Sequence, residues 1–167
     1  MRRSEFTESI VAFIGLGLLF APAELHAATC SVSTPGLAFG AYSVYAAAAT
    51  NGTGTLTVTC SKVAGDPNSI TVSYVISLST GSSSSYVQRT MKSGANSLGY
   101  NLYTTNTHSV VWGDGTGSTQ TVSNSIRLTN GSPTNSKNNT VFGQIPPLQD
   151  VAVSSSYLDN VTVTVTY

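Results

Sequence analysis

Apolar and polar residues alternate strictly over the last eight residues of the chain, "NVTVTVTY" (residues 160–167). Val161, Val163 and Val165 alternate with threonines, and Tyr167 follows. A period of two is typical of a β-strand with one buried face. The pattern predicts a terminal strand. It leaves open whether this is an ordinary last strand or an edge to which another chain adds a strand.

Further runs of alternating or β-rich sequence recur at short intervals: residues 37–44, 54–61, 69–79, 97–104, 109–114, 119–123, 125–130, 140–146 and 148–153. Turn sequences such as "AGDPN" (64–68), "TGSSSS" (80–85) and "GDGTG" (113–117) separate them. No stretch of useful length carries apolar residues at helical spacing. Many short strands joined by Gly- and Asn-rich turns favour an all-β fold of the sandwich type.

The segment "YAAAATNG" (residues 45–52) is unusual because four alanines stand between strand patterns. A short helical turn and an apolar loop both fit this composition. The simpler interpretation is an ordinary connection between two strands.

The first 27 residues are typical of a secretory signal peptide. Arg2 and Arg3 precede an apolar run, residues 10–21, and small residues follow it. The run is too short to span a bilayer, and no later stretch is apolar for long enough. We therefore expect residues 1–27 to be cleaved after Ala27. Residues 28–167 then form a single exported domain that does not insert into a membrane.

Charge is scarce in residues 28–167, which hold five basic and four acidic residues and no Glu. A neutral, charge-poor surface offers no electrostatic footprint for nucleic acid or anionic lipid. Ser, Thr, Asn and Gly take the place of charge, mixed with Val, Tyr and Leu. This composition also favours strands and turns over helices.

Cys30 and Cys60 are the only cysteines of the chain. In an exported protein, a single disulfide is the natural prediction. A reactive thiol pair is the alternative, but it would call for the closer CxxC spacing.

Candidate catalytic groups are few, so we expect no enzyme activity, no catalytic residue, no cofactor and no metal. His108 is the only histidine after residue 27, which excludes a histidine cluster. Neither GxSxG nor SxxK occurs among the serines. Asp66 and Asp114 lie in turn sequences where an aspartate side chain accepts backbone N–H bonds. A hydrolase with two paired carboxylates remains as an alternative.

Several motifs, in this order along the chain, resemble those of the spore coat protein U domain, which the pilins of archaic chaperone-usher systems share. They are "TCSVSTPGLAFGAY" (29–42), "GTLTVTCS" (54–61), "LGYNLYTT" (98–105), "VVWGDGTG" (110–117), "TVFGQIPPLQDV" (140–151) and "YLDNVTVTVTY" (157–167). The resemblance implies an incomplete immunoglobulin-like β-sandwich that lacks its last strand. It also implies a periplasmic chaperone, an outer-membrane usher and a neighbouring pilus subunit as partners, and a final place in a surface fimbria or coat.

In this scheme the last strand is an open edge, and Val161, Val163, Val165 and Tyr167 are the residues expected to accept a strand from the chaperone or from another subunit. Only Ala28 and Thr29 separate the expected cleavage site from Cys30. We therefore expect a subunit that accepts a strand without donating one, at a fimbrial tip or alone. The candidate tip contacts are Tyr45, Ala46, Ala47, Ala48, Ala49 and Tyr86.

Two positions depart from the family pattern: Gln144 stands where Arg is expected, and "PPLQD" (146–150) where a small residue and Gly are expected. These departures concern the detail of one connection. A self-sufficient secreted binding module, with a complete sandwich, is the alternative function.

Overall fold

The computed structural model describes residues 28–154 and 156–167. The regular structure of these residues is almost entirely β, with one short 3-10 turn, η1. In chain order the elements are β1 (Thr29–Ser33), β2 (Thr50–Ser61), β3 (Ser69–Leu78), η1 (Gly81–Ser83), β4 (Arg89–Ser93), β5 (Asn96–Tyr103), β6 (Val122–Thr129), β7 (Thr134–Ile145) and β8 (Val163–Thr166). The all-β prediction is confirmed.

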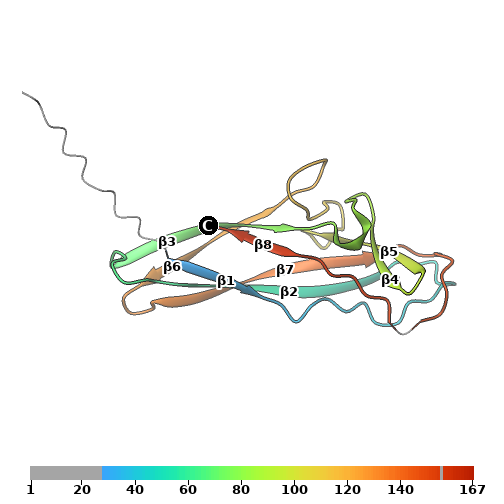
Figure 1. Ribbon diagram of the computed structural model, residues 1–167, viewed down its shortest axis with the longest axis horizontal. Helices are drawn as coiled ribbons and strands as arrows, with labels where there is room; N and C mark the ends of the chain where they lie inside the picture. The colour runs from blue at the N-terminus through green and yellow to red at the C-terminus, as the bar shows by residue number, and fades with distance from the viewer. Residues whose placement is uncertain (1–27, 155) are drawn as a thin grey trace, which may run out of the picture.

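The strands form two antiparallel sheets that pack face to face as a sandwich (Figure 1). One sheet has five strands in the order β1-β2-β7-β5-β4, and the other has three in the order β6-β3-β8. The first and last strands of the fold, β1 and β8, are therefore the outermost strands of different sheets.

The core between the sheets follows from the alternation along each long strand. In β2, Leu56, Val58 and Cys60 point inward and are buried, and in β3 the buried positions include Tyr74 and Ile76. Burying an apolar side chain of this size stabilises the fold by roughly 1.5–3 kcal/mol. Trp112 is fully buried beside them, and its indole N–H donates to the carbonyl of Ile76 at 3.0 Å.

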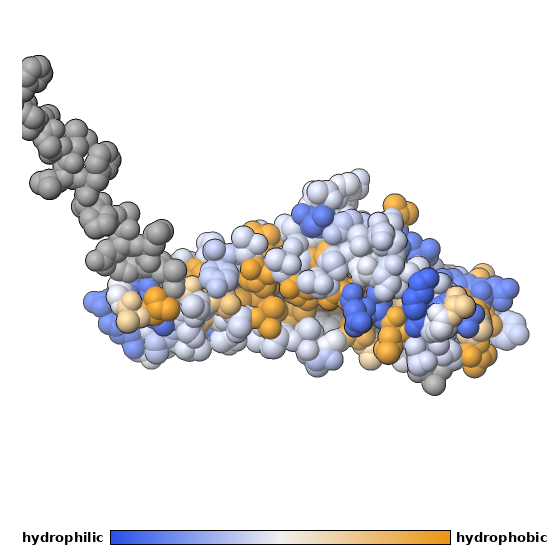
Figure 2. Space-filling view, in the orientation of Figure 1, coloured by the Kyte–Doolittle hydropathy of each residue, from blue (hydrophilic) through white to orange (hydrophobic). Residues whose placement is uncertain are grey.

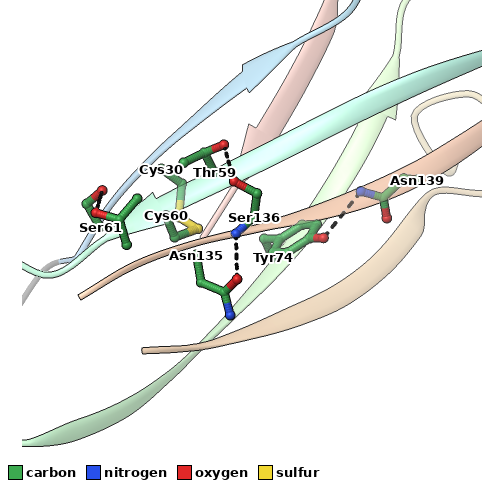
Figure 3. Close-up of a disulfide and its surroundings, with 9 residues drawn as sticks. Cys30, Thr59, Cys60, Ser61, Tyr74, Asn135, Ser136 and Asn139 are labelled. Carbon is green, nitrogen blue, oxygen red and sulfur yellow. Dashed lines mark hydrogen bonds between the residues drawn. A yellow bond between two sulfur atoms is a disulfide. The ribbon is translucent and has the colours of Figure 1, made fainter. Parts of the chain in front are cut away.

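The structure joins Cys30 to Cys60, which are directly opposite each other in the β1–β2 pairing, so the predicted disulfide is confirmed (Figure 3). On the outer face of the same sheet, hydroxyl groups bond across strands, as Thr59 and Ser136 do at 2.7 Å. The inner face instead carries a buried amide, Asn139, which donates to the Tyr74 hydroxyl at 3.3 Å. The Cys30–Cys60 disulfide thus anchors the short edge strand β1 to the long strand β2.

Three runs that the alternation predicts as strands are irregular: residues 37–44, 148–153 and 109–114 contain no strand, and the last of these forms only isolated bridges at Val111 and Trp112. The first is flanked and interrupted by Gly36 and Gly40, whose φ angles of 87° and 75° are not compatible with extended structure. The second begins at Leu148, with φ 58°. The four alanines form an apolar loop, with a turn in which the Ala46 N–H donates to Ser43.

The expected signal peptide, residues 1–27, lies outside the described residues. Within the described ranges, no helix is long and apolar enough to cross a membrane.

Candidate functional site

The terminal strand β8 lies at the end of the three-stranded sheet and pairs with β3, opposite Val75–Leu78. Within the described part of the chain, no strand pairs with the other side of β8. An unpaired edge presents a row of N–H and C=O groups to which a further strand can bond.

The open side of β8 carries the backbone groups of its valines. The Ser79 N–H donates to the carbonyl of Thr162 at 3.0 Å. Antiparallel pairing alternates from residue to residue, so Thr164 also turns its backbone groups toward β3. Val163 and Val165 turn theirs away, as the same alternation predicts for Val161, which lies just before β8. The side chains of all three pack against the core and are only half-buried. The same three residues thus offer hydrogen bonds and incompletely covered apolar surface to a neighbour.

The opposite wall of this site is the edge of the other sheet. Strand β1 lies against β8, and its inward residues Cys30 and Val32 are also only half-buried. Figure 1 shows β8 on the front of the molecule between β3 and β1, and Figure 2 shows apolar side chains gathered along the same band. We call the band of half-buried apolar residues between β8 and β1, together with the two cavities described next, the groove.

The two cavities have volumes of about 340 Å³ and about 510 Å³. Val161 and Val163 line the first, and Val44 and Val151 line the second. Side chains that line both are Leu37, Phe39, Met91, Tyr157 and Leu158. The two cavities therefore adjoin one another, and their walls are largely apolar.

Asp159 is the one charged residue that lines either cavity among the described residues. Its carboxylate accepts bonds from the Ser82 N–H at 2.8 Å and from the Tyr100 hydroxyl at 2.7 Å. Burial, reinforced by the bond to Asp159, raises the pKa of Tyr100 well above its ordinary value of 10.0. The carboxylate is thus engaged in holding the wall of the groove together.

The predicted contact residues occupy different environments. Tyr45 is 90% exposed, and Ala47 and Ala48 are exposed on the same loop. Tyr86 is half-buried instead: its hydroxyl donates to the Leu78 carbonyl at 2.9 Å, and the Arg89 guanidinium lies 5.2 Å from its ring centre. Tyr167, at the end of the predicted edge, is 56% exposed.

The aspartates that could have served hydrolysis are held in local structure. Asp66 accepts the Val63 N–H at 2.7 Å, and Asp114 accepts the N–H and hydroxyl of Thr116 at 2.9 and 2.7 Å. The bonds from Thr116 lower the pKa of Asp114 below its ordinary value. The prediction that both aspartates accept backbone bonds in turns is confirmed. No cluster of potential metal ligands occurs within the described residues.

Sequence reasoning did not assign Leu37 and Phe39 to the site, although they line both cavities. They belong to "GLAFG" (residues 36–40), most of which falls in the run 37–44 that the alternation predicts as a strand. The two glycines were the signal that could have identified an irregular segment here.

Comparison with known proteins gives two matches of interest. Residues 18–164 match the family model described as Spore Coat Protein U domain. The fold is similar to a chain in the crystal structure of the CsuC–CsuE chaperone–tip adhesion subunit pre-assembly complex, from the archaic chaperone-usher Csu pili of Acinetobacter baumannii, with a TM-score of 0.51 at 20% identity. The match covers 84% of this chain and 40% of that chain. No curated protein matches the sequence.

Proposed function

Because the chain belongs to the spore coat protein U domain family, we propose that it is an exported structural subunit that assembles by accepting a β-strand from another polypeptide. The observation that carries this proposal is the open edge of β8. There, Val163 and Val165, with Val161 just before the strand, combine half-buried side chains with backbone groups that face no other strand among the described residues.

The energetics favour a strand as the occupant of the groove. An added strand would bond to the free edge of β8 and place every second side chain between the two sheets. Each apolar side chain of Val size that it buries contributes roughly 1.5–3 kcal/mol. The burial of three such side chains is comparable to the 5–15 kcal/mol net stability of a typical domain. Whether a strand occupies the groove therefore has a large effect on the stability of the subunit.

The partners follow from this mode of assembly. The similar chain of known structure comes from a complex of a chaperone with a pilus subunit. We propose that a periplasmic chaperone first supplies a strand to the groove, and that a neighbouring subunit replaces it as the chain passes an outer-membrane usher. Residues 1–27 direct export, residues 28–167 form the domain, and the product is a surface fimbria or coat.

A tip position with an adhesive role is the finer part of the proposal. Only Ala28 and Thr29 precede Cys30 after the expected cleavage site, a length too short to serve as a donor strand. The exposed Tyr45 and the loop alanines 46–49 supply an apolar contact surface. In this role the protein is structural and adhesive, and it needs no catalytic group.

The test is the native mass of the chain isolated from the periplasm of its host. An affinity tag inserted after Asn106, in the exposed loop that follows β5, leaves both β8 and β1 unaltered. We expect a one-to-one complex with an immunoglobulin-like chaperone. This complex should be lost in Val163→Asp and kept in Thr164→Asp, whose side chain points outward.

A lone, cooperatively folded monomer in the same preparation would contradict the proposal. The sandwich would then be self-sufficient, and the chain would be a secreted binding module.

A further inference from the structure

A short loop of the chain, residues 36–40 ("GLAFG"), lies inside the groove, and we propose that it is a displaceable plug that competes with an incoming strand. The inference rests on the proposed function and goes beyond it. In the proposed function a strand enters the groove. The plug determines how readily that strand enters. We refer to residues 36–40 as the plug.

The plug lies on a patch of sheet that has no side chains of its own. Gly52 of β2 and Gly143 of β7 are directly opposite each other in the pairing of these strands. A Cβ atom at Gly52 would lie 3.0 Å from the Leu37 side chain, and one at Gly143 would lie 2.7 Å from the Phe39 ring. Gly54 is equally close, since its Cβ would lie 3.2 Å from that of Leu37. Leu37 and Phe39 can therefore rest on the sheet only because these three positions, the glycine floor, are glycine.

Glycines also stand at both ends of the plug. Gly36 and Gly40 have φ angles of 87° and 75°, and a Cβ at either would meet nothing within 4 Å. Both are exposed, so their surroundings leave room for other backbone conformations. Glycine moves between left-handed and ordinary conformations at little cost, which makes the two residues suitable hinges.

The attachment of the plug to the groove is by side chains. Within the described residues, no backbone–backbone hydrogen bond joins residues 35–42 to a strand. Leu37 and Phe39 are only half-buried, and the Phe39 ring meets Tyr100 edge to face at 5.7 Å between centroids. A segment held without backbone bonds can leave without breaking a sheet.

The position of the plug explains why it would have to leave. Leu37 and Phe39 line both cavities, together with Met91, Tyr157 and Leu158, so they lie where the two compartments of the groove adjoin. A strand is straight and continuous, so a strand that follows the groove past both compartments has to take the space that Leu37 and Phe39 occupy. The glycine floor would then receive side chains of the incoming strand in place of Leu37 and Phe39.

Competition of this kind has a distinctive thermodynamic signature. The plug stabilises the free chain. It also weakens strand binding, because the apparent Kd equals the intrinsic Kd divided by the fraction of molecules in which the groove is open. A substitution that loosens the plug should lower the melting temperature of the free chain and at the same time tighten strand binding. A fixed wall of the groove would behave differently, because loosening it would weaken both.

The probe is the fluorescein-labelled peptide KTVTVTVTVK, with KTSTSTSTSK as its polar control, and binding to the purified chain is measured by fluorescence polarisation. We expect Phe39→Ala to tighten the apparent Kd for KTVTVTVTVK by about tenfold, since the open fraction rises. Val87→Ala, at a residue that is 92% exposed and lines neither cavity, is the control and should leave the Kd unchanged. Neither form should bind the polar peptide.

A second variant tests the plug from the opposite direction and does not depend on a loosened chain remaining folded. The Cβ separation of 3.2 Å between Leu37 and a residue built at Gly54 is close to the range of about 3.5–4.5 Å found in disulfides. In Leu37→Cys/Gly54→Cys, the oxidised pair should lock the plug onto the floor and weaken peptide binding more than tenfold. Leu37→Ser/Gly54→Ser is its control, and peptide mapping verifies that Cys30 remains bonded to Cys60.

Each result decides between the models. If the locked chain binds the peptide as well as its serine control, or if Phe39→Ala binds more weakly than the parent chain, the plug is a fixed wall and the inference is wrong, while strand acceptance stands. If neither the parent chain nor Phe39→Ala binds the peptide, strand acceptance itself fails, and the inference fails with it.

Discussion

The Arg89 guanidinium donates two hydrogen bonds to the carbonyl oxygen of Ser79, at 3.0 and 2.8 Å. Because this carbonyl is occupied, the N–H of Thr162 donates to the Ser79 hydroxyl instead, at 2.9 Å. Regular pairing between β3 and β8 begins only at the next residue, Val163. A buried cation thus helps to determine where the open strand starts.

Arg89 should be essential for stability. It is fully buried and also donates to the Asn101 side chain at 2.7 Å and to the Trp112 carbonyl at 2.8 Å. Arg89→Met removes the donor to the carbonyls of Ser79 and Trp112, at about 1–3 kcal/mol for each, whereas the Asn101 oxygen keeps the bond from the Leu102 N–H. We expect the free energy of unfolding, measured with urea, to fall by at least about 2 kcal/mol. Arg127→Met, at an exposed position, is the control, and an equal loss there would contradict this role of Arg89.

The register of β8 predicts opposite outcomes for the same substitution, to Asp, at the neighbouring residues Val163 and Thr164. Val163→Asp places a charge in the groove between the sheets, where it is costly without a partner. Thr164→Asp places the same charge on the exposed outer face. In immunoblots of isolated surface fimbriae, we expect Val163→Asp to be absent and Thr164→Asp to be present. Normal incorporation of Val163→Asp would show that the inward face had been assigned incorrectly.

The disulfide should contribute measurably to folding in an oxidising compartment. Cys30 and Cys60 are separated by 30 positions, and closing such a loop stabilises a fold by roughly 3–4 kcal/mol in the chain-entropy model. Cys30→Ser/Cys60→Ser should therefore lower the periplasmic yield and the melting temperature. Ser31→Ala, on the exposed face of the same strand, should change neither. If the double variant has the same melting temperature as the parent chain, the disulfide makes no measurable contribution to stability.

The raised pKa of Tyr100 predicts that the folded chain loses stability at high pH. Burial raises its pKa above 10.0, and its bond to the Asp159 carboxylate raises it further. Above pH 10 the unfolded chain releases this proton while the folded chain keeps it, so the free energy of unfolding decreases as the pH rises, by at most about 1.4 kcal/mol per pH unit. Below pH 10 the full contribution is present.

Urea unfolding between pH 8 and pH 11 tests this, over a range placed around the ordinary pKa of tyrosine, about 10. Tyr100→Phe should be less stable than the parent chain at pH 8, because it loses the bond to Asp159, and should lose less stability as the pH rises. Tyr45→Phe, in which the altered ring is 90% exposed, is the control. Parallel curves for the parent chain and Tyr100→Phe would contradict the assignment.

The sequence by itself determined the features that depend on local periodicity. Alternation in residues 160–167 was sufficient to predict a terminal strand with Val163 and Val165 facing inward, because side chains on a strand alternate between its two faces; the strand itself is shorter, Val163–Thr166. The turn bonds of Asp66 and Asp114 were also predictable, since a short polar side chain bonds to its own backbone neighbours.

Only the tertiary structure decided what lies beside these elements. Residues 37–44 alternate as a strand does, yet they form a loop. The surface on which Leu37 rests, the glycine floor, is assembled from β2 and β7, far away in sequence. Gln149 likewise bonds both the N–H and the carbonyl of Gly99, at 2.8 Å each, a contact across 50 positions that no local pattern encodes. The groove exists because β1 and β8 end different sheets, and which strands become edges is set by long-range pairing rather than by the residues of the edge itself.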